Sequence, residues 1–180
     1  MHRPRARGGA RHREESLGTH GGPHDAPSRP VLDRQARTYD ARTAGIERRS
    51  LAHSRRWVCD RATGHTLEIA IGTAPTCRTM PRSLRLTGVD ASAAMLERAA
   101  ERARTLGRSV DLVRADAADL PSRTPRSTPW CTFGLCCVAD EESVITEALR
   151  VLRPAGHLLL ADHTGHACGR CGCCNARRSC

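Results

Sequence analysis

Aromatic side chains are almost absent from this chain, whose 180 residues include two Trp, one Tyr and one Phe. Proteins that bind single-stranded nucleic acid by stacking need several exposed rings, so nucleic acid is a disfavoured partner. Long apolar runs are also lacking, and no stretch approaches the roughly 20 residues of a membrane-spanning helix. The N-terminal residues carry no apolar stretch of the kind found in secretory signals. We therefore expect a soluble, cytoplasmic protein with no membrane segment.

Leu, Ile, Val and Phe are scarce, and most of them lie between His65 and His163. Segments with few apolar residues and many charges cannot bury enough surface to fold. We expect a disordered basic tail over residues 1–30, one folded domain over residues 31–163, and a disordered Cys-rich tail over residues 164–180.

Basic residues outnumber acidic ones by 29 to 19, which gives a formal net charge of +10. A positive charge of this size favours anionic partners without identifying one. The Arg-rich arm over residues 1–30 could bind nucleic acid or direct organelle import, but its Gly and Pro residues disfavour an amphipathic helix. A solvated tail is the favoured interpretation.

Short apolar runs alternate with helical periodicity through the middle of the chain. Buried strands are predicted over residues 66–71, 84–90, 109–114 and 157–161, and helices over residues 93–106 and 141–152. Ser92 is placed to cap the first of these helices, and Gly107 to end it. One or two surface helices are expected over residues 33–62, with an apolar stripe formed by Ile46, Leu51, Trp57 and Val58. This alternation predicts an α/β fold with a doubly wound, mostly parallel sheet.

Three predicted strands end in residues suited to bind a nucleoside. Gly72 and Thr73 follow the first strand, Asp90 ends the second, and Asp116 and Ala117 follow the third. Ligands of open parallel sheets lie beyond the carboxyl ends of the strands. A glycine there lets the backbone approach a ligand closely, and an acid on the neighbouring strand can accept hydrogen bonds from ribose hydroxyls.

Five segments resemble successive motifs of class I S-adenosylmethionine-dependent methyltransferases, most closely the group typified by ubiquinone/menaquinone C-methyltransferases (methyltransferase type 11). They are RQARTYD at 34–40, LEIAIGT at 67–73, LTGVDASAAML at 86–96, DAADLP at 116–121 and RVLRPAG at 150–156. The resemblance implies a Rossmann-like fold, S-adenosyl-L-methionine as cofactor, and a small-molecule methyl acceptor.

By the same resemblance, Glu68 and the Gly72 turn would hold the methionine end of the cofactor, Asp90 the ribose, and Asp116 with Ala117 the adenine. The implied cofactor-binding residues are Tyr39, Glu68, Gly72, Thr73, Asp90, Ala91, Asp116, Ala117 and Thr132. Structural roles compete with two of these: Asp90 could be an acid that interacts with the N-terminus of the following helix, and Asp116 a turn former. His163 is the one candidate base, although a surface histidine is the simpler interpretation.

Two segments depart from the family pattern. Ala74 stands where the family has a further glycine, so its methyl group is expected to obstruct the cofactor, and prolines interrupt residues 122–130, where a central apolar strand should begin. Read one nucleotide out of frame with G/C-rich codons, residues 74–81, 122–130 and 167–178 regain family-like or amphipathic sequence. We therefore hypothesise short frame-shifted segments and an impaired or inactive enzyme. Resequencing the coding DNA tests this.

The C-terminal region leaves an alternative function open. Five cysteines, Cys168, Cys171, Cys173, Cys174 and Cys180, follow His163 and His166, and Cys168 and Cys171 have zinc-ligand spacing. A zinc-stabilised basic binding module is therefore the alternative, but no second spaced pair follows, so no metal site is predicted. An NAD-type dehydrogenase is a further alternative, but the spaced glycine triplet that it should show is absent from this sequence. The sheet is expected to be incomplete at its C-terminal edge, because no strand-like sequence follows residue 161.

Overall fold

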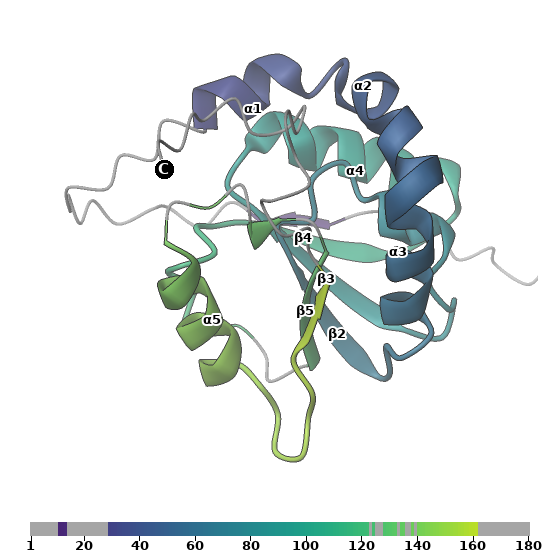
Figure 1. Cartoon of the computed structure of the whole chain (residues 1–180). Helices are drawn as coiled ribbons and strands as arrows, with labels where there is room; N and C mark the ends of the chain where they lie inside the picture. The colour runs from purple at the N-terminus through teal and green to yellow at the C-terminus, as the bar shows by residue number, and fades with distance from the viewer. Residues whose placement is uncertain are drawn as a thin grey trace, which may run out of the picture.

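The structure, a computed structural model, describes residues 11–13, 29–122, 124, 128–132, 134–135, 138 and 140–161. At its centre is a 6-stranded sheet with the order β1-β4-β3-β2-β5-β6, in which all neighbouring strands are parallel (Figure 1). The strands are β1 (Arg11–Arg13), β2 (His65–Ile69), β3 (Arg85–Asp90), β4 (Val110–Arg114), β5 (Thr128–Thr132) and β6 (Leu159–Ala161). This arrangement confirms the predicted Rossmann-like α/β fold.

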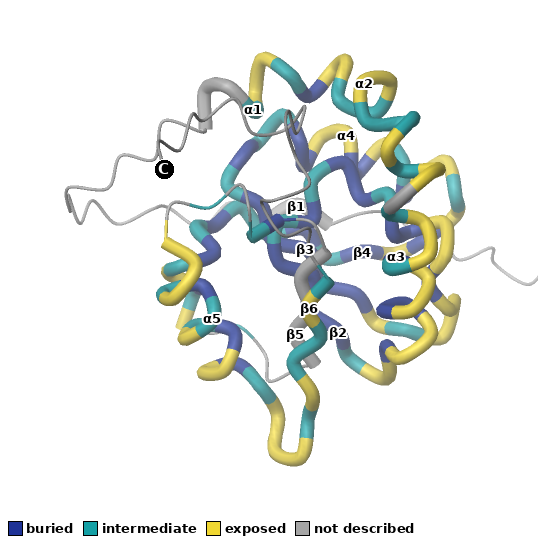
Figure 2. The backbone as a smooth tube through the Cα atoms, in the orientation of Figure 1, coloured by how far each residue is buried: buried dark blue, intermediate teal, exposed yellow. Residues whose placement is uncertain are grey.

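Helices cover both faces of the sheet. They are α1 (Arg29–Gln35), α2 (Tyr39–Ile46), the π-helix η1 (Glu47–Leu51), α3 (Ala52–Cys59), the 3-10 helix η2 (Pro75–Arg78), α4 (Ala93–Thr105) and α5 (Glu141–Arg150). One apolar cluster joins α3 and α4 to the sheet through Val58, Leu96 and Leu112, and a second joins α5 through Val144 and Ile69. Figure 2 shows the buried stretches along the strands and the exposed outer surfaces of the helices. The sheet is therefore the middle one of three layers.

The predicted helix start at Ser92 is confirmed. Its hydroxyl accepts a hydrogen bond from the backbone N–H of Met95 over 3.1 Å, as an N-cap does. Gly107 follows the helix with a φ of +60°, which only glycine adopts at low cost. Asp140 caps α5 in the same way, with its carboxylate 3.1 Å from the N–H of Ser143.

The apolar stripe expected over residues 33–62 is partly wrong. Ile46 and Trp57 are 41% and 43% exposed, whereas Val58 is buried. Residues 39–59 form consecutive helical segments, and the π-helical turn η1 adds a residue to one turn and so rotates the buried face. Arg55 is buried instead, paired with Glu47 over 2.5 Å.

β5 forms despite the prolines that precede and enter it. Pro129 lies opposite Leu67 of β2, and pairing with β6 begins one residue later at Trp130. A proline lacks only its N–H, so a strand tolerates it where one neighbour's ladder has not yet started. The expected disruption therefore does not extend to residues Thr128–Thr132.

The N-terminal segment contributes one unexpected strand. Arg11–Arg13, within the residues expected to be disordered, pairs in parallel with residues Asp111 to Val113 of β4. Main-chain pairing at a sheet edge needs no apolar pattern, so the composition of the arm gave no sign of it. The rest of residues 1–28 and all of residues 162–180, including the expected Cys-rich tail, lie outside the described residues.

Candidate functional site

Gly72 and Asp90 meet where β2 and β3 end, at what we call the carboxyl edge of the sheet. The backbone N–H of Gly72 donates a hydrogen bond to Oδ2 of Asp90 over 2.8 Å. Gly72 has a φ of +57°, and a Cβ built on it would meet nothing within 4 Å. The glycine therefore serves the turn, and the space beside it is open to a ligand.

The other carboxylate oxygen of Asp90 is held by the start of the next helix. Oδ1 accepts the backbone N–H of Ser92 over 2.9 Å. Burial raises the pKa of Asp90 above its ordinary value, while the N–H groups of Ser92 and Gly72 oppose that rise. Asp90 therefore does interact with the N-terminus of the following helix, which is the competing structural role, and it binds Gly72 at the same time.

The end of β4 lies beside the same edge. Arg114 pairs in register with Asp90, and the N–H of Ala115 donates to the carbonyl of Asp90 over 3.2 Å. Asp116 accepts the N–H of Ala118 over 3.0 Å through Oδ1, which is the geometry of a turn former. The three strand ends that carry Gly72, Asp90 and Asp116 therefore lie side by side.

Ala91 and Ala117 also lie at this edge. The carbonyl of Ala91 accepts from Nε of Arg114 over 3.4 Å. Ala117 is 8% exposed and belongs to the apolar cluster under α5. Thr132 ends β5 opposite Ala161, one residue beyond the pairing of Cys131 with Ile69, so its backbone reaches the carboxyl edge too.

Glu68 lies behind the glycine turn and supports it. It is 2% exposed, and its Oε2 accepts the hydroxyl of Thr76 over 2.6 Å. Thr76 belongs to η2, the helical turn that follows the loop. A buried carboxylate bonded in this way fixes the path of the chain after Gly72.

Ala74, whose methyl group is expected from the sequence to obstruct the cofactor, directly precedes η2. It adopts the left-handed conformation, with φ 55° and ψ 49°, but is fully buried within the apolar cluster that also contains Cys77. Its methyl group therefore packs against the core. The residue that follows Gly72 directly, Thr73, is also buried.

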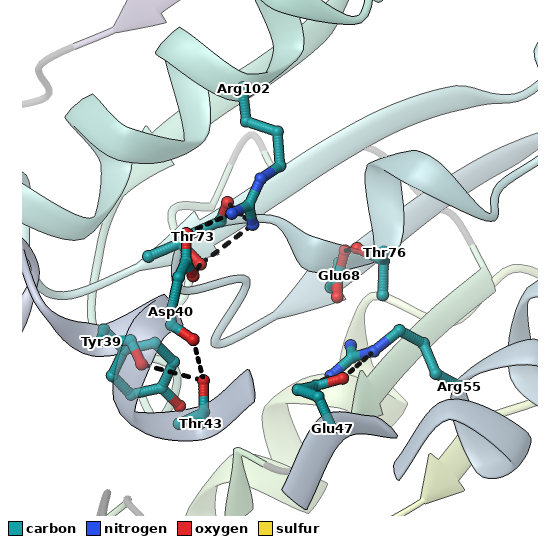
Figure 3. A network of polar contacts seen from close by, with 9 residues as sticks. All are labelled: Tyr39, Asp40, Thr43, Glu47, Arg55, Glu68, Thr73, Thr76 and Arg102. Carbon is teal, nitrogen blue, oxygen red and sulfur yellow. Dashed lines mark hydrogen bonds and ion pairs between the residues drawn. The ribbon is translucent and has the colours of Figure 1, made fainter. Parts of the chain in front are cut away.

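A polar network joins the glycine turn to two helices (Figure 3). The hydroxyl of Thr73 donates to Oδ1 of Asp40 over 2.6 Å, and Asp40 is also ion-paired with Arg102. Asp40 stands in the first turn of α2 beside Tyr39, whose carbonyl accepts the hydroxyl of Thr43 over 2.9 Å. Because Asp40 contacts Thr73, the network also brings the adjacent Tyr39, a predicted cofactor-binding residue, close to the glycine turn.

Sequence reasoning missed Asp40 and Arg102 as parts of this site. Asp40 lies within the RQARTYD motif, but only Tyr39 was singled out there. Arg102 borders the apolar face of α4 formed by Ala99 and Ala103, where a partly buried arginine signals a specific partner. That signal does not reveal which partner.

The described residues offer neither a metal-binding cluster nor a membrane-spanning helix. They contain no group of three or more His, Cys, Asp or Glu placed to hold a metal ion. The candidate zinc ligands and the candidate base His163 lie outside this part of the chain. None of the described helices combines the length and apolar character that crossing a membrane requires.

Comparisons with known proteins find relatives of this chain in sequence and in fold. A family model described as "Methyltransferase domain" matches residues 66–156, just over half of the chain. The malonyl-[acyl-carrier protein] O-methyltransferase of Alcanivorax borkumensis is 39% identical over 101 residues, covering 54% of this chain and 34% of the relative. The ubiquinone/menaquinone biosynthesis C-methyltransferase UbiE of Desulfotalea psychrophila is 36% identical over 110 residues, covering 58% and 44%.

A solved structure described as the DhpI-SAM-HEP complex has a similar fold, with a TM-score of 0.62 and 25% sequence identity. The match covers 76% of this chain and 64% of that one. The chain thus spans less than half of the length of the two curated relatives above.

Proposed function

Because the chain belongs to the methyltransferase domain family, we propose that it binds S-adenosylmethionine at the carboxyl edge and transfers a methyl group to a small-molecule acceptor. The observation that carries this proposal is the bond from Gly72 N–H to Asp90 Oδ2, which joins a glycine turn and an acid on neighbouring strands. This pairing is suited to a nucleoside, because the turn leaves room and the acid accepts hydroxyl groups.

The residues at this edge fit the cofactor. A carboxylate offers about four lone-pair positions. The carboxylate of Asp90 interacts with three backbone N–H groups, those of Gly72, Ala91 and Ser92. Capacity therefore remains for a ribose hydroxyl. Asp90 is 8% exposed. The space next to Gly72 is open, because a Cβ added to this residue would have no neighbouring atom within 4 Å.

Bound S-adenosylmethionine would supply a methyl group activated by the sulfonium. The chain's own contribution is to orient and to exclude water, which are the main protein effects in a displacement of this kind. Asp90 would fix the ribose, the Gly72–Thr73 turn the amino-acid end, and Asp116 with Ala117 the adenine. A base is needed only if the acceptor must lose a proton, and His163 is the candidate for that role.

The acceptor is proposed no more finely than a small molecule. The two relatives named above act on different acceptors according to their names, and each extends well beyond the matched segment. The segments outside the match are therefore where acceptor choice would be determined. Reduced activity from frame-shifted segments stays a prediction, tested by resequencing.

Calorimetric titration with S-adenosylhomocysteine tests the cofactor site. We expect saturable binding to the wild-type chain, weakened at least roughly tenfold in Asp90→Ala, because the ribose loses charge-assisted hydrogen bonds. Asp90→Asn keeps one acceptor oxygen for the backbone N–H groups and guards against misfolding of the alanine variant. Asp111→Ala is the control, because Asp111 lies near the amino-terminal end of β4, away from the carboxyl edge. Absence of binding by a folded wild-type sample would overturn the proposal.

A further inference from the structure

Arg102 makes three polar contacts, two with the glycine turn and one with α2. Its Nη1 donates to the carbonyl of Thr73 over 2.6 Å and to the hydroxyl of Thr73 over 3.1 Å. Its Nη2 is ion-paired with Oδ2 of Asp40. One guanidinium therefore contacts both the turn after β2 and the first turn of α2.

The contacts form a closed triangle, because the hydroxyl of Thr73 also donates to Oδ1 of Asp40 over 2.6 Å. Figure 3 shows Asp40 and Thr73 facing the end of the Arg102 side chain. The three residues come from α2, from the turn and from α4, which are separated by 33 and 29 residues along the chain. Nothing local in the sequence brings them together, so each contact depends on the position of the other two elements.

The geometry needs arginine in particular. A planar guanidinium directs separate N–H groups at Thr73 and Asp40 at once, whereas a lysine ammonium is a point charge on a flexible stem. The side chain of Arg102 is 14% exposed and that of Asp40 is 43% exposed, so water screens the contacts with buried Thr73 less than it screens the ion pair with Asp40. Thr73 is 1% exposed, and its main chain continues directly from Gly72.

We propose that Arg102 is a positioning residue of the cofactor site, which couples the orientation of the Gly72–Thr73 turn to the docking of α2. This inference rests on the proposed cofactor function. Arg102 holds the carbonyl and hydroxyl of Thr73, and thereby sets the direction of the backbone at Gly72. The same guanidinium holds Asp40, and with it the start of α2, next to the turn.

The coupling is reciprocal by thermodynamic necessity. If docking of α2 orients the turn for the cofactor, binding of the cofactor must stabilise docked α2 by the same factor. Tyr39, which stands beside Asp40, is then brought to the site only when α2 is docked. Loss of the Arg102 contacts therefore weakens cofactor binding and loosens α2 together.

Hydrogen exchange of the α2 amides without ligand is the first measurement. We expect Arg102→Gln and Asp40→Asn each to speed exchange in residues 39–46 by about tenfold, which is within the usual range of coupling between sites. Arg98→Gln is the matched control, because Arg98 lies one turn earlier on α4 and pairs with Glu101 on the surface. Its effect should stay below roughly twofold.

Calorimetry with S-adenosylhomocysteine is the second measurement. Arg102→Gln should weaken binding by about tenfold. Arg102→Lys should fail to restore it, because the charge is kept but the two-sided contact is lost. In the wild type, saturating ligand should further slow exchange in α2, and this slowing should shrink in Arg102→Gln. A residue that only stabilised the fold would lower the melting temperature and leave the ligand affinity of the folded protein unchanged.

The outcomes separate this inference from the proposed function. If the wild type binds the ligand and folded Arg102→Gln binds it equally well, the inference is wrong while the cofactor site stands. If Arg102→Lys behaves as wild type, the two-sided contact is not what matters, and the inference is also wrong. If the wild type does not bind the ligand, the proposed function fails. Independently of ligand binding, unchanged hydrogen exchange of α2 in Arg102→Gln would refute the link between Arg102 and α2.

Discussion

The N–H of Gly72 lies 2.8 Å from Oδ2 of Asp90, although 18 residues separate the two in the sequence. The bond ties the turn after β2 to the last residue of β3. It also constrains Asp90, whose other oxygen is bound by Ser92 at the start of α4. The acid is therefore preorganised before any ligand arrives, and this should govern how cofactor binding responds to pH.

Binding of S-adenosylhomocysteine should weaken as the pH falls through the pKa of Asp90. Burial raises that pKa above the ordinary value of 3.8, so protonation occurs at a higher pH than for an exposed aspartate. The neutral acid accepts hydroxyl hydrogen bonds less well, and affinity is lost on the acidic side. Calorimetry from neutral pH downward, with circular dichroism to confirm folding, measures this. Asp90→Asn should bind more weakly with a flatter profile, and equal pH profiles for both proteins would contradict the assignment.

Gly88→Ala should destabilise the fold by about 1–3 kcal/mol, as overpacking usually does. A Cβ at residue 88 would lie 2.3 Å from Cδ1 of Ile71 and 3.1 Å from its Cγ2. Ile71→Val deletes that Cδ1. The double variant should therefore lose less stability than the sum of the losses in the two single variants. Urea unfolding of the four proteins forms the double-mutant cycle. Strict additivity would show that the two side chains do not meet.

Ala155→Gly should stabilise the protein by about 0.5–1 kcal/mol, because Ala155 has a φ of 55° and is exposed. A rise of a few degrees in melting temperature would report it. Ala74→Gly relieves the same strain at a φ of 55° but removes a fully buried methyl group, which contributes about 0.8 kcal/mol. Its net effect should be near zero. Equal stabilisation by both changes would contradict the burial of Ala74.

Cys59 and Cys77 should resist alkylation in the native protein. Burial raises the pKa of each thiol to about 12, so the reactive thiolate is almost absent near pH 8. Pulsed iodoacetamide labelling, followed by peptide mass analysis, should find both unmodified until denaturant is added. Rapid native labelling of either peptide would show that it is accessible. The same two peptides, labelled after denaturation, serve as the internal standard for reagent activity.

Much of the fold followed from local patterns. The strand ending in Asp90, the cap at Ser92 and the turn at Gly107 each have a local physical cause that a single sequence displays. Because parallel strands end at one edge, the proximity of Gly72 and Asp90 followed from those strands. The family resemblance then suggested which ligand this edge would bind.

Other features depend on contacts that no local pattern encodes. The pairing of Arg11–Arg13 with β4 uses main-chain groups, so its side chains give no signal. The π-helical turn η1 interrupts residues 39–59, so a single α-helical period does not describe their buried face, and Trp57 is exposed. Likewise, the pair between Asp40 and Arg102 joins residues 62 apart, and its partners became visible only in three dimensions.

A diffraction structure of the protein with S-adenosylhomocysteine tests the assignment of the carboxyl edge most directly. We predict a ribose hydroxyl within about 2.8 Å of the Asp90 carboxylate, with the nucleoside lying across the turn at Gly72. A nucleoside bound at another surface, with the Asp90 carboxylate contacting only backbone N–H groups, would contradict it.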